Sequence, residues 1–389
     1  MRMIDLTEGE ERRGPRVGMV TRFPPSTSAS APGSSELVKR LVRRYGIPVE
    51  VIRLVLPGER SATAIPVVMD LNPSWHMSAQ LAAQRANSCD IAFVQMERHI
   101  PVAMIDELVS ELTIPIVLCI DEVPAAGSEV TASMAAIASR VDHVVVHSDV
   151  ARRRLESEAQ RPVAVEVIPH GSPWKVMEPP IGPRSTILTW GFLAPGIGVE
   201  RVIRVLPQLS DLEPTARYRI IGVPDPGWSR QEVDSYRDDL LTQGTTLGVA
   251  DRFELVPIYH TRKELAAEIA ASDLVAVVYD SRDRSASRIL TEALSAGRPV
   301  VATAFPGAIE MLATGAGTTV AHDDEEGMTR AIRRYLSNED EYSNAVGRAV
   351  AISAQVSWDE VARRLAGVIT GHSPERDAIV ETLHGDPSR

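Results

Sequence analysis

Short apolar runs alternate with longer amphipathic segments along most of the chain. In the first half, the apolar runs cover residues 16–23, 49–56, 91–95, 116–120, 141–147 and 163–168. In the second half, they cover residues 186–189, 218–223, 253–258, 274–279 and 299–303. The segments between the runs are long enough for helices, and continuous apolar strands are typical of parallel sheets covered on both faces. The pattern therefore predicts an α/β protein with two Rossmann-like domains.

A proline-rich segment without hydrophobic periodicity separates the two series of strands. It covers residues 174–184 and reads WKVMEPPIGPR, a composition typical of a connection between domains. We therefore expect a first domain over residues 1–173, a hinge over 174–184 and a second domain over 185–356. The length of 389 residues suits two domains that each bury a core of their own.

The first expected helix has an apolar face and a basic face. We place it at residues 36–45, after a cap at Ser34 or Ser35. Its apolar positions are Leu37, Val38, Leu41 and Val42, and its basic positions are Lys39, Arg40, Arg43 and Arg44. Two interpretations of the basic face stay open, namely a solvated surface and a contact with an anionic membrane surface.

Composition narrows the classes of function. The net charge of −11 argues against a general nucleic-acid binder. Cys89 and Cys119 adjoin or lie within apolar runs, so we expect buried free thiols in a reducing compartment. No group of His, Cys and Asp shows metal-ligand spacing in the sequence, and two cysteines cannot make a structural zinc site. Because no run approaches about 20 apolar residues and the amino terminus lacks the apolar core of a signal peptide, we expect a cytoplasmic protein, at most peripheral at the inner membrane face.

The most informative stretch covers residues 271–312. It predicts a strand at 274–279, a loop rich in Arg and Ser, a helix at 286–296, a turn, and a second strand. In a parallel crossover the unpaired N–H groups of the helix face the carboxyl edge of the sheet, where an anion binds. Arg282, Arg284 and Arg288 would supply guanidinium groups to that anion. Asp280 and Asp283 favour instead a surface loop of alternating charge, and both interpretations stay open.

The segment EALSAGRPVVAT, followed by Gly307 and Glu310, resembles the sugar-donor site of the retaining glycosyltransferases of family 4, which have the GT-B fold. The resemblance implies that Glu292 contacts the ribose of a nucleotide. The position eight residues earlier, which is acidic in the family and contacts the donor sugar, is Arg284 here. The family also places the nucleobase beside the backbone around Ile258.

The glycine loop that opens the second half is a further resemblance. It carries Gly191 and Gly198, whose counterparts in the family lie beside the diphosphate. Phe192 and Ile197 stand where relatives have a polar residue and a Lys. The loop therefore offers backbone N–H groups but lacks one positive charge near a diphosphate.

Segments of the first half resemble the family less closely. His147, His170 and Gly171 match a strand ending in His-Ser and a later Ile-Pro-His-Gly. Glu97 matches an acidic position, although Met96 replaces the His before it. Asp121 stands where many relatives have a His that contacts the reacting sugar. The acidic pair Asp121 and Glu122 at this strand end either accepts a hydroxyl proton or orients an acceptor, or it only caps a helix or faces water, and these interpretations stay open.

The resemblance implies transfer of a hexose-type sugar, with retained anomeric configuration, from a nucleotide diphosphate sugar to a hydroxyl-bearing acceptor such as a sugar, a lipid-linked sugar or a small metabolite. It implies neither a bound metal nor a cofactor. It also implies that residues 357–389 form a helix that crosses back to the first domain, followed by a polar tail. The implied residues are Asp121 and Arg284 for catalysis, Gly191, Gly198, Ile258, Arg282, Ser287, Arg288, Ile289 and Glu292 for the sugar donor, and Arg22, Glu97 and His170 for the acceptor side.

A second hypothesis is a GT-B protein without transfer activity that binds or activates a true transferase. The replaced Lys and Arg284 both favour it. A dehydrogenase is disfavoured, because no Gly-x-Gly-x-x-Gly follows a strand with an acidic residue about 20 positions on. The sequence leaves open whether the chain forms a homo-oligomer.

Overall fold

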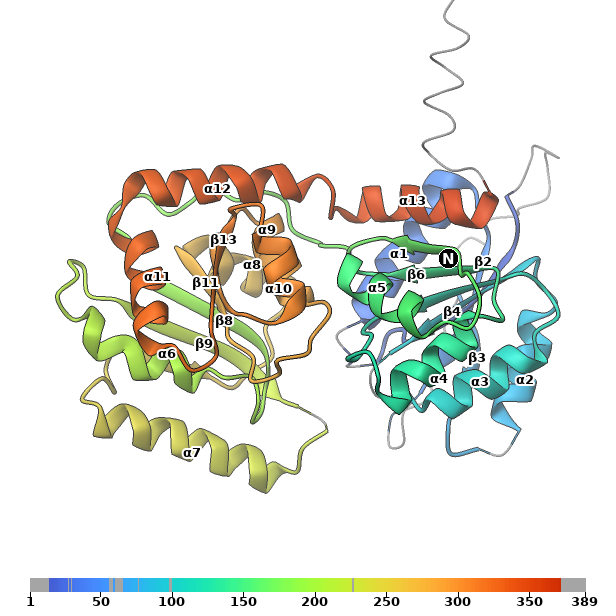
Figure 1. Cartoon of the computed structure of the whole chain (residues 1–389), viewed down its shortest axis with the longest axis horizontal. Helices are drawn as coiled ribbons and strands as arrows, with labels where there is room; N and C mark the ends of the chain where they lie inside the picture. The colour runs from blue at the N-terminus through green and yellow to red at the C-terminus, as the bar shows by residue number, and fades with distance from the viewer. Residues whose placement is uncertain are drawn as a thin grey trace, which may run out of the picture.

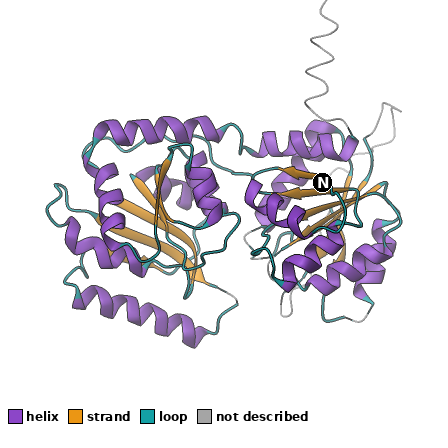
Figure 2. Ribbon diagram, viewed as in Figure 1, coloured by secondary structure: helices purple, strands orange, loops and turns teal. Residues whose placement is uncertain are grey.

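The computed structural model describes residues 14–26, 28, 30–55, 59, 66–75, 77–97, 100–225 and 227–371. The chain forms two α/β domains, one from each half of the sequence (Figure 1). Helices cover the sheet of each domain (Figure 2). The amino terminus before residue 14 and the polar tail after residue 371 lie outside the described residues, so the expectations on them stay predictions.

The first domain contains a parallel sheet built on buried strands. In spatial order its strands are β3 (Val67–Leu71), β2 (Val49–Leu54), β1 (Val17–Thr21), β4 (Ile91–Met96), β5 (Ile116–Ile120), β6 (His143–Val146) and β7 (Val165–Val167). The chain order reverses between β1 and β4, which are paired in parallel. Reversals of this kind open a crevice at the carboxyl ends of the strands.

The second domain repeats the arrangement. In spatial order its strands are β10 (Phe253–Val256), β9 (Arg217–Pro224), β8 (Thr186–Leu193), β11 (Leu274–Val277), β12 (Val300–Thr303) and β13 (Gly317–Val320). The reversal lies between β8 and β11, again a parallel pair. Two Rossmann-like sheets, each with its own switch point, agree with the expectation from the apolar runs.

The helices follow the strands in regular alternation. Those of the first domain are α1 (Ala31–Tyr45), α2 (Ser78–Ala86), α3 (Val102–Glu111), α4 (Glu129–Ala138) and α5 (Asp149–Glu158). Those of the second are α6 (Glu200–Val205), the 3-10 helix η1 (Leu206–Leu209), α7 (Arg230–Thr246), α8 (Arg262–Ala271), α9 (Arg288–Ser295), α10 (Pro306–Leu312), α11 (Glu325–Ser337) and α12 (Glu339–Ser353). The last described helix is α13 (Trp358–Thr370).

The chain returns to the first domain at its carboxyl end. Figure 1 shows α12 running along the second domain and α13 continuing over the first, beside α1. Trp358 and Leu365 of α13 belong to the same buried apolar cluster as Leu37 and Phe93 of the first domain. The indole of Trp358 lies so close to Gly171 that a Cβ atom there would come within 2.4 Å of it. Gly171 therefore serves close packing rather than a chain reversal with positive φ.

Two helix boundaries differ from the expectation. Helix α1 begins at Ala31 rather than at residue 36, with a proline in its first turn, so Ser34 lies inside the helix and not at its cap. Helix α9 begins at Arg288 rather than at residue 286, because the hydroxyl of Ser287 accepts a bond from the backbone N–H of Leu290 and caps the helix. The sequence offers both Pro32 and several serines as signals for a helix start, and it did not show which of them sets the start of α1.

Partners neutralise much of the basic face of α1. Arg40 pairs with Glu36 at 2.7 Å and with Asp359 of α13 at 2.8 Å, and Arg44 lies 3.3 Å from the same Asp359. Exposed pairs of this kind contribute little free energy, but they reduce the positive field that an anionic surface would attract. Among the described residues, no helix has the length and apolar character needed to cross a membrane.

Candidate functional site

Polar side chains gather where neighbouring strands of the first sheet end. Cys119 and Asp121 lie two residues apart at the end of β5, and therefore on one face, while His147 follows the adjacent β6. The carboxylate of Asp121 accepts a hydrogen bond from Nε2 of Gln95 at 2.8 Å and lies 3.4 Å from Nε2 of His147. Burial opposes ionisation of Asp121, but His147, Arg288 and Gln95 outweigh it and lower the pKa of this carboxyl.

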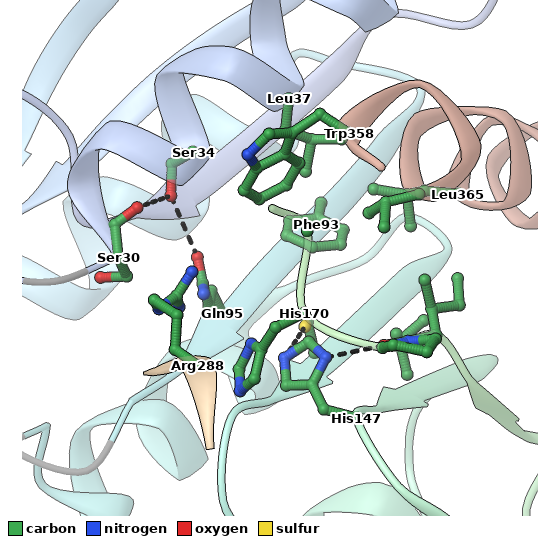
Figure 3. A pocket seen from close by; sticks show the side chains of 16 residues that line it. Ser30, Ser34, Leu37, Phe93, Gln95, His147, His170, Arg288, Trp358 and Leu365 are labelled. Atoms are coloured by element: carbon green, nitrogen blue, oxygen red, sulfur yellow. Dashed lines mark hydrogen bonds between the residues drawn. The ribbon is translucent and has the colours of Figure 1, made fainter. Parts of the chain in front are cut away.

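His147 is held from its other ring nitrogen. Its Nδ1 donates to the carbonyl of Ile168 at 2.7 Å, since a carbonyl oxygen can only accept. The ring lies against that of His170 (Figure 3), and the two ring centroids are 3.7 Å apart. Burial, together with the neighbouring His147 and Arg288, lowers the pKa of His170 well below its usual value. The side chain of His170 is therefore a neutral imidazole at neutral pH.

Glu97 is the second acid of this edge. It accepts a bond from the hydroxyl of Ser30 at 2.5 Å. Burial, followed by repulsion from Asp121, raises the pKa of Glu97 to about 8. Glu97 is therefore protonated and Asp121 ionised at neutral pH, so the pair offers one hydrogen-bond donor and one acceptor to a ligand.

Arg22 lies beneath this edge with its guanidinium occupied. It is 2% exposed, and it donates to the carbonyl of Leu54 at 3.2 Å and to the hydroxyl of Ser26 at 2.7 Å. It also pairs with Glu59. The structure thus gives Arg22 the contacts of a residue that ties the loops around β1 together.

Three side chains approach each other closely enough to hold a metal ion. Ligand atoms of Cys119, Asp121 and His147 lie within 4.8 Å of one another. The sequence showed no such group, because its members come from two strands that are adjacent only in the folded sheet. Burial and the neighbouring acids Asp121 and Glu97 raise the pKa of the Cys119 thiol well above its usual value. A metal would have to displace that proton and compete with Arg288, whose guanidinium lies 3.9 Å from Asp121.

The amino terminus of α9 faces this cluster from the second domain. Ser287 caps the helix and lies 3.2 Å from the hydroxyl of Tyr279. The guanidinium of Arg284 stacks over the Tyr279 ring at 4.2 Å from its centroid. Arg288, in the first turn of α9, reaches across to Asp121. Two guanidinium groups thus accompany the unpaired N–H groups of the helix terminus.

Arg282 is directed elsewhere. It pairs with Asp323 at 2.5 Å, and both side chains are mostly exposed. The acidic residues of the same loop also have partners, since Asp280 pairs with Arg201 and Asp283 pairs with Arg154 of the first domain. The loop therefore combines both interpretations, with Arg284 and Arg288 at the helix terminus and Arg282 in a surface pair.

The glycine loop after β8 passes close to the same helix terminus. Gly191 has φ +127°, and a Cβ there would come within 2.9 Å of the side chain of Ile289. Gly198 has φ +77°, and a Cβ would lie 1.8 Å from the carbonyl oxygen of Val278. Only glycine fits this backbone and this space. The partly buried Ile197 packs against the apolar core of the second domain.

Glu292 lies on α9 behind the helix terminus. Its Oε2 accepts hydrogen bonds from the indole nitrogens of Trp174 at 3.3 Å and Trp190 at 3.4 Å. Burial raises the pKa of this carboxyl, against the opposing effects of Arg288 and the two indoles. Ile258, expected near a nucleobase, follows β10 and is 59% exposed. The sequence analysis did not single out the two tryptophans or Gln95, because nothing in the linear order links them to Glu292 or Asp121.

A pocket joins the two sides of the site. Arg288 of α9 lies near Gln95 and His170 at its polar end, and Trp358 of α13 packs at its apolar end with Leu37 and Phe93 (Figure 3). The cavity measures about 50 Å³. The domains also contact each other beside it, where Ser285 accepts a bond from the backbone N–H of Val123 at 3.1 Å.

A second contact between the domains comes from α10. The two carboxylate oxygens of Glu310 accept bonds from the backbone N–H groups of Asp149 and Val150, each at 2.8 Å. A carboxylate of one domain thus caps α5 of the other, which is a favourable position for a negative charge.

Comparison with known proteins agrees with this geometry. Residues 184–338 match the sequence model of the family described as Glycosyl transferases group 1. Among the curated proteins compared with it, none matches the chain. Several solved structures match nearly the whole chain.

The similar structures share the fold at low sequence identity. Sucrose-phosphate synthase from Thermosynechococcus elongatus has a TM-score of 0.70 at 15% identity, and the match covers 94% of this chain and 99% of that one. The Anabaena protein HepE, in complex with UDP and glucose, has a TM-score of 0.67 at 16% identity, covering 91% and 99%. An α,α-trehalose 6-phosphate synthase from Burkholderia multivorans has a TM-score of 0.67 at 13% identity, covering 96% and 99%. The chain therefore has the GT-B fold, as the sequence predicted, and its second domain is similar in sequence to group 1 glycosyltransferases.

Proposed function

We propose that the protein is a retaining glycosyltransferase that moves a hexose-type sugar from a nucleotide diphosphate sugar to a hydroxyl group. The observation that carries the proposal is the meeting of Asp121 from the first domain with Arg288 at the amino terminus of α9. A negative group at the carboxyl edge of the first sheet and a positive group of the second domain thus face each other across one site. The family match of the second domain and the UDP complex of HepE support a nucleotide sugar as donor substrate.

In this proposal the second domain holds the departing diphosphate. The unpaired N–H groups of α9, with Arg284 and Arg288, stabilise the negative charge that develops on the leaving oxygen. No metal is required for that role, because two guanidinium groups and a helix terminus supply the positive potential. The leaving phosphate itself helps to deprotonate the sugar acceptor.

The first domain orients hydroxyl groups of the transferred sugar and of the acceptor. Ionised Asp121 accepts a hydrogen bond from the reacting sugar, and protonated Glu97 donates one to the sugar acceptor. Neutral His170 adds a hydrogen-bonding ring to the same wall. The acceptor belongs to the hydroxyl-bearing class of sugars, lipid-linked sugars and small metabolites.

The test is a product assay with a panel of nucleotide sugars. Release of a nucleoside diphosphate, measured with and without candidate sugar acceptors, identifies the donor substrate. Proton NMR of the anomeric hydrogen in the product then reports whether configuration is retained. We expect Asp121→Asn to lower kcat by at least about tenfold. Inversion at the anomeric carbon, or full activity of Asp121→Asn, would contradict the proposed mechanism.

A second candidate function is a GT-B partner protein without transfer activity. The packing of Ile197 into the core favours it, because a positive side chain at this position would otherwise face the diphosphate. Nucleotide binding without turnover on any tested nucleotide sugar, together with stimulation of another transferase, would select this candidate.

A further inference from the structure

The carboxylate of Glu292 is held on one side only. Oε2 has two lone pairs, and the indole N–H groups of Trp174 and Trp190 donate to it. These two bonds use the full accepting capacity of Oε2. In the part of the chain that the structure describes, no protein group donates to Oε1. A ligand hydroxyl therefore finds only Oε1 as a free acceptor on this carboxylate.

The two indoles come from different parts of the fold. Trp190 lies on β8 and is 4% exposed, whereas Trp174 lies in the connection between the domains and is 7% exposed. The backbone carbonyl of Trp174 accepts a bond from the hydroxyl of Ser295, at the end of α9, at 2.8 Å. Ser172, two residues before Trp174, is hydrogen-bonded to the segment that leads into α13, because its backbone N–H donates to the carbonyl of Val356 at 2.7 Å.

An alternative role for the indoles is packing alone. Both rings lie in the apolar cluster around α9 and would bury much the same area without a hydrogen bond. However, a partly buried carboxylate without partners would rotate toward solvent or take up a proton, because burial alone disfavours its charge. Two converging N–H groups fix the rotamer and oppose the effect of burial, so they favour the ionised form, which accepts a hydrogen bond from a hydroxyl group.

We infer that Trp174 and Trp190 are positioning residues for ribose recognition, which hold Oε2 of Glu292 so that Oε1 alone accepts from the ribose hydroxyls of a nucleotide. This inference rests on the proposed function, since it assumes a nucleotide sugar at α9. The connection between the domains, which carries Trp174, then takes part directly in nucleotide recognition. A change of the connection that moves Trp174 therefore changes ribose affinity.

The experiment compares ribonucleotides with their 2′,3′-dideoxy forms. Isothermal titration of the full chain with UDP, ADP and GDP, each in both forms, gives a ratio of dissociation constants for the base that binds. We expect the unmodified protein to favour the ribose form by about tenfold, the effect of a hydrogen bond to a charged group. The ratio isolates the hydroxyl contact from contacts of the base and phosphates.

Four variants then assign the contact. Trp174→Phe and Trp190→Phe keep an aromatic ring and remove the N–H donor, and we expect each to lower the ratio to about threefold or less. Glu292→Gln is expected to lower it similarly. Trp75→Phe is the matched control, because Trp75 is 58% exposed in the first domain and should leave the ratio unchanged.

A ratio that stays near tenfold in both Trp174→Phe and Trp190→Phe would overturn the inference while leaving the proposed function intact. A failure of the unmodified protein to bind any of the nucleotides would remove the proposed function and this inference with it. If a phenylalanine variant does not fold, indole ¹⁵N–¹H spectra of the unmodified protein decide the matter. Movement of the Trp174 and Trp190 signals with the ribose form, and less with the dideoxy form, supports the inference, and equal movement with both overturns it.

Discussion

Glu97 makes the stability of the protein depend on pH in an unusual direction. Its pKa is raised from 4.5 to about 8 by burial and by Asp121, so the folded protein retains a proton that the unfolded chain loses. Between pH 4.5 and 8 the folded state therefore binds more protons, and the free energy of unfolding falls as pH rises through this window. Replacement by glutamine keeps the shape and the bond to Ser30 but removes the titration.

The magnitude follows from the linkage relation. Between pH 6 and pH 8 Glu97 stays ionised in the unfolded chain, whereas the folded protein holds the proton up to its pKa of about 8. Over this range the free energy of unfolding therefore falls by about 2 kcal/mol. We expect the free energy of unfolding of Glu97→Gln to exceed that of the unmodified protein already at pH 6, because the unfolded carboxyl is ionised there, and by about 2 kcal/mol more at pH 8.

Urea denaturation at both pH values measures the difference. Glu111→Gln, at an exposed position of α3, is the control and should show the same difference at pH 6 and pH 8. A Glu97→Gln difference that is independent of pH would refute the reasoning, because it would mean that Glu97 is already ionised at pH 6 in the folded state.

Three other predictions concern the glycine loop, Arg284 and the contact between domains. Gly198→Ala should destabilise by about 2 kcal/mol or more, because its Cβ would lie 1.8 Å from a carbonyl oxygen at φ +77°, whereas Gly347→Ala on open helix surface should be neutral or stabilising in the same thermal melts. Arg284→Glu should weaken binding of a diphosphate or an acidic nucleotide sugar by about tenfold in calorimetry; unchanged or tighter binding would show that Arg284 serves no anion. Glu310→Ala should increase the radius of gyration in small-angle scattering, since α5 loses its cap from the other domain, and saturating nucleotide should reduce the radius in the unmodified protein; identical curves would count against a role in closure.

The fully buried strands were predictable from the sequence, and so were the edge strands β7 and β10, but the edge strands β3 and β13 were not. Continuous apolar runs such as Ile116–Ile120 show directly which segments lie inside a covered sheet. Val67–Leu71 escaped notice because most of its residues are only partly buried at the sheet edge, and Gly317–Val320 because it is short and polar. An edge strand pairs with one neighbouring strand only, so its sequence needs fewer apolar residues than the sequence of a central strand.

The candidate site likewise contains residues that could be placed from the sequence and residues that could not. Arg284 and Arg288 could be placed at a helix terminus because strand, loop and helix follow one another in the chain. Gln95 and His147 reach Asp121 only through the lateral order of β4, β5 and β6, which hydrophobic periodicity does not encode. Trp174 and Glu292 are likewise brought together by tertiary packing, so sequence reasoning identified the acid but not the groups that hold it.

The packing of Trp358 against Gly171 bears on the order in which the protein is made. Synthesis proceeds from the amino terminus, so the first sheet leaves the ribosome long before α13 exists to cover Leu37 and Phe93. Until then, part of the apolar surface that α13 will bury stays open to water and to other chains. The first domain is thus the earliest to be synthesised and the last to be completed, and its nascent form is an expected client for chaperones.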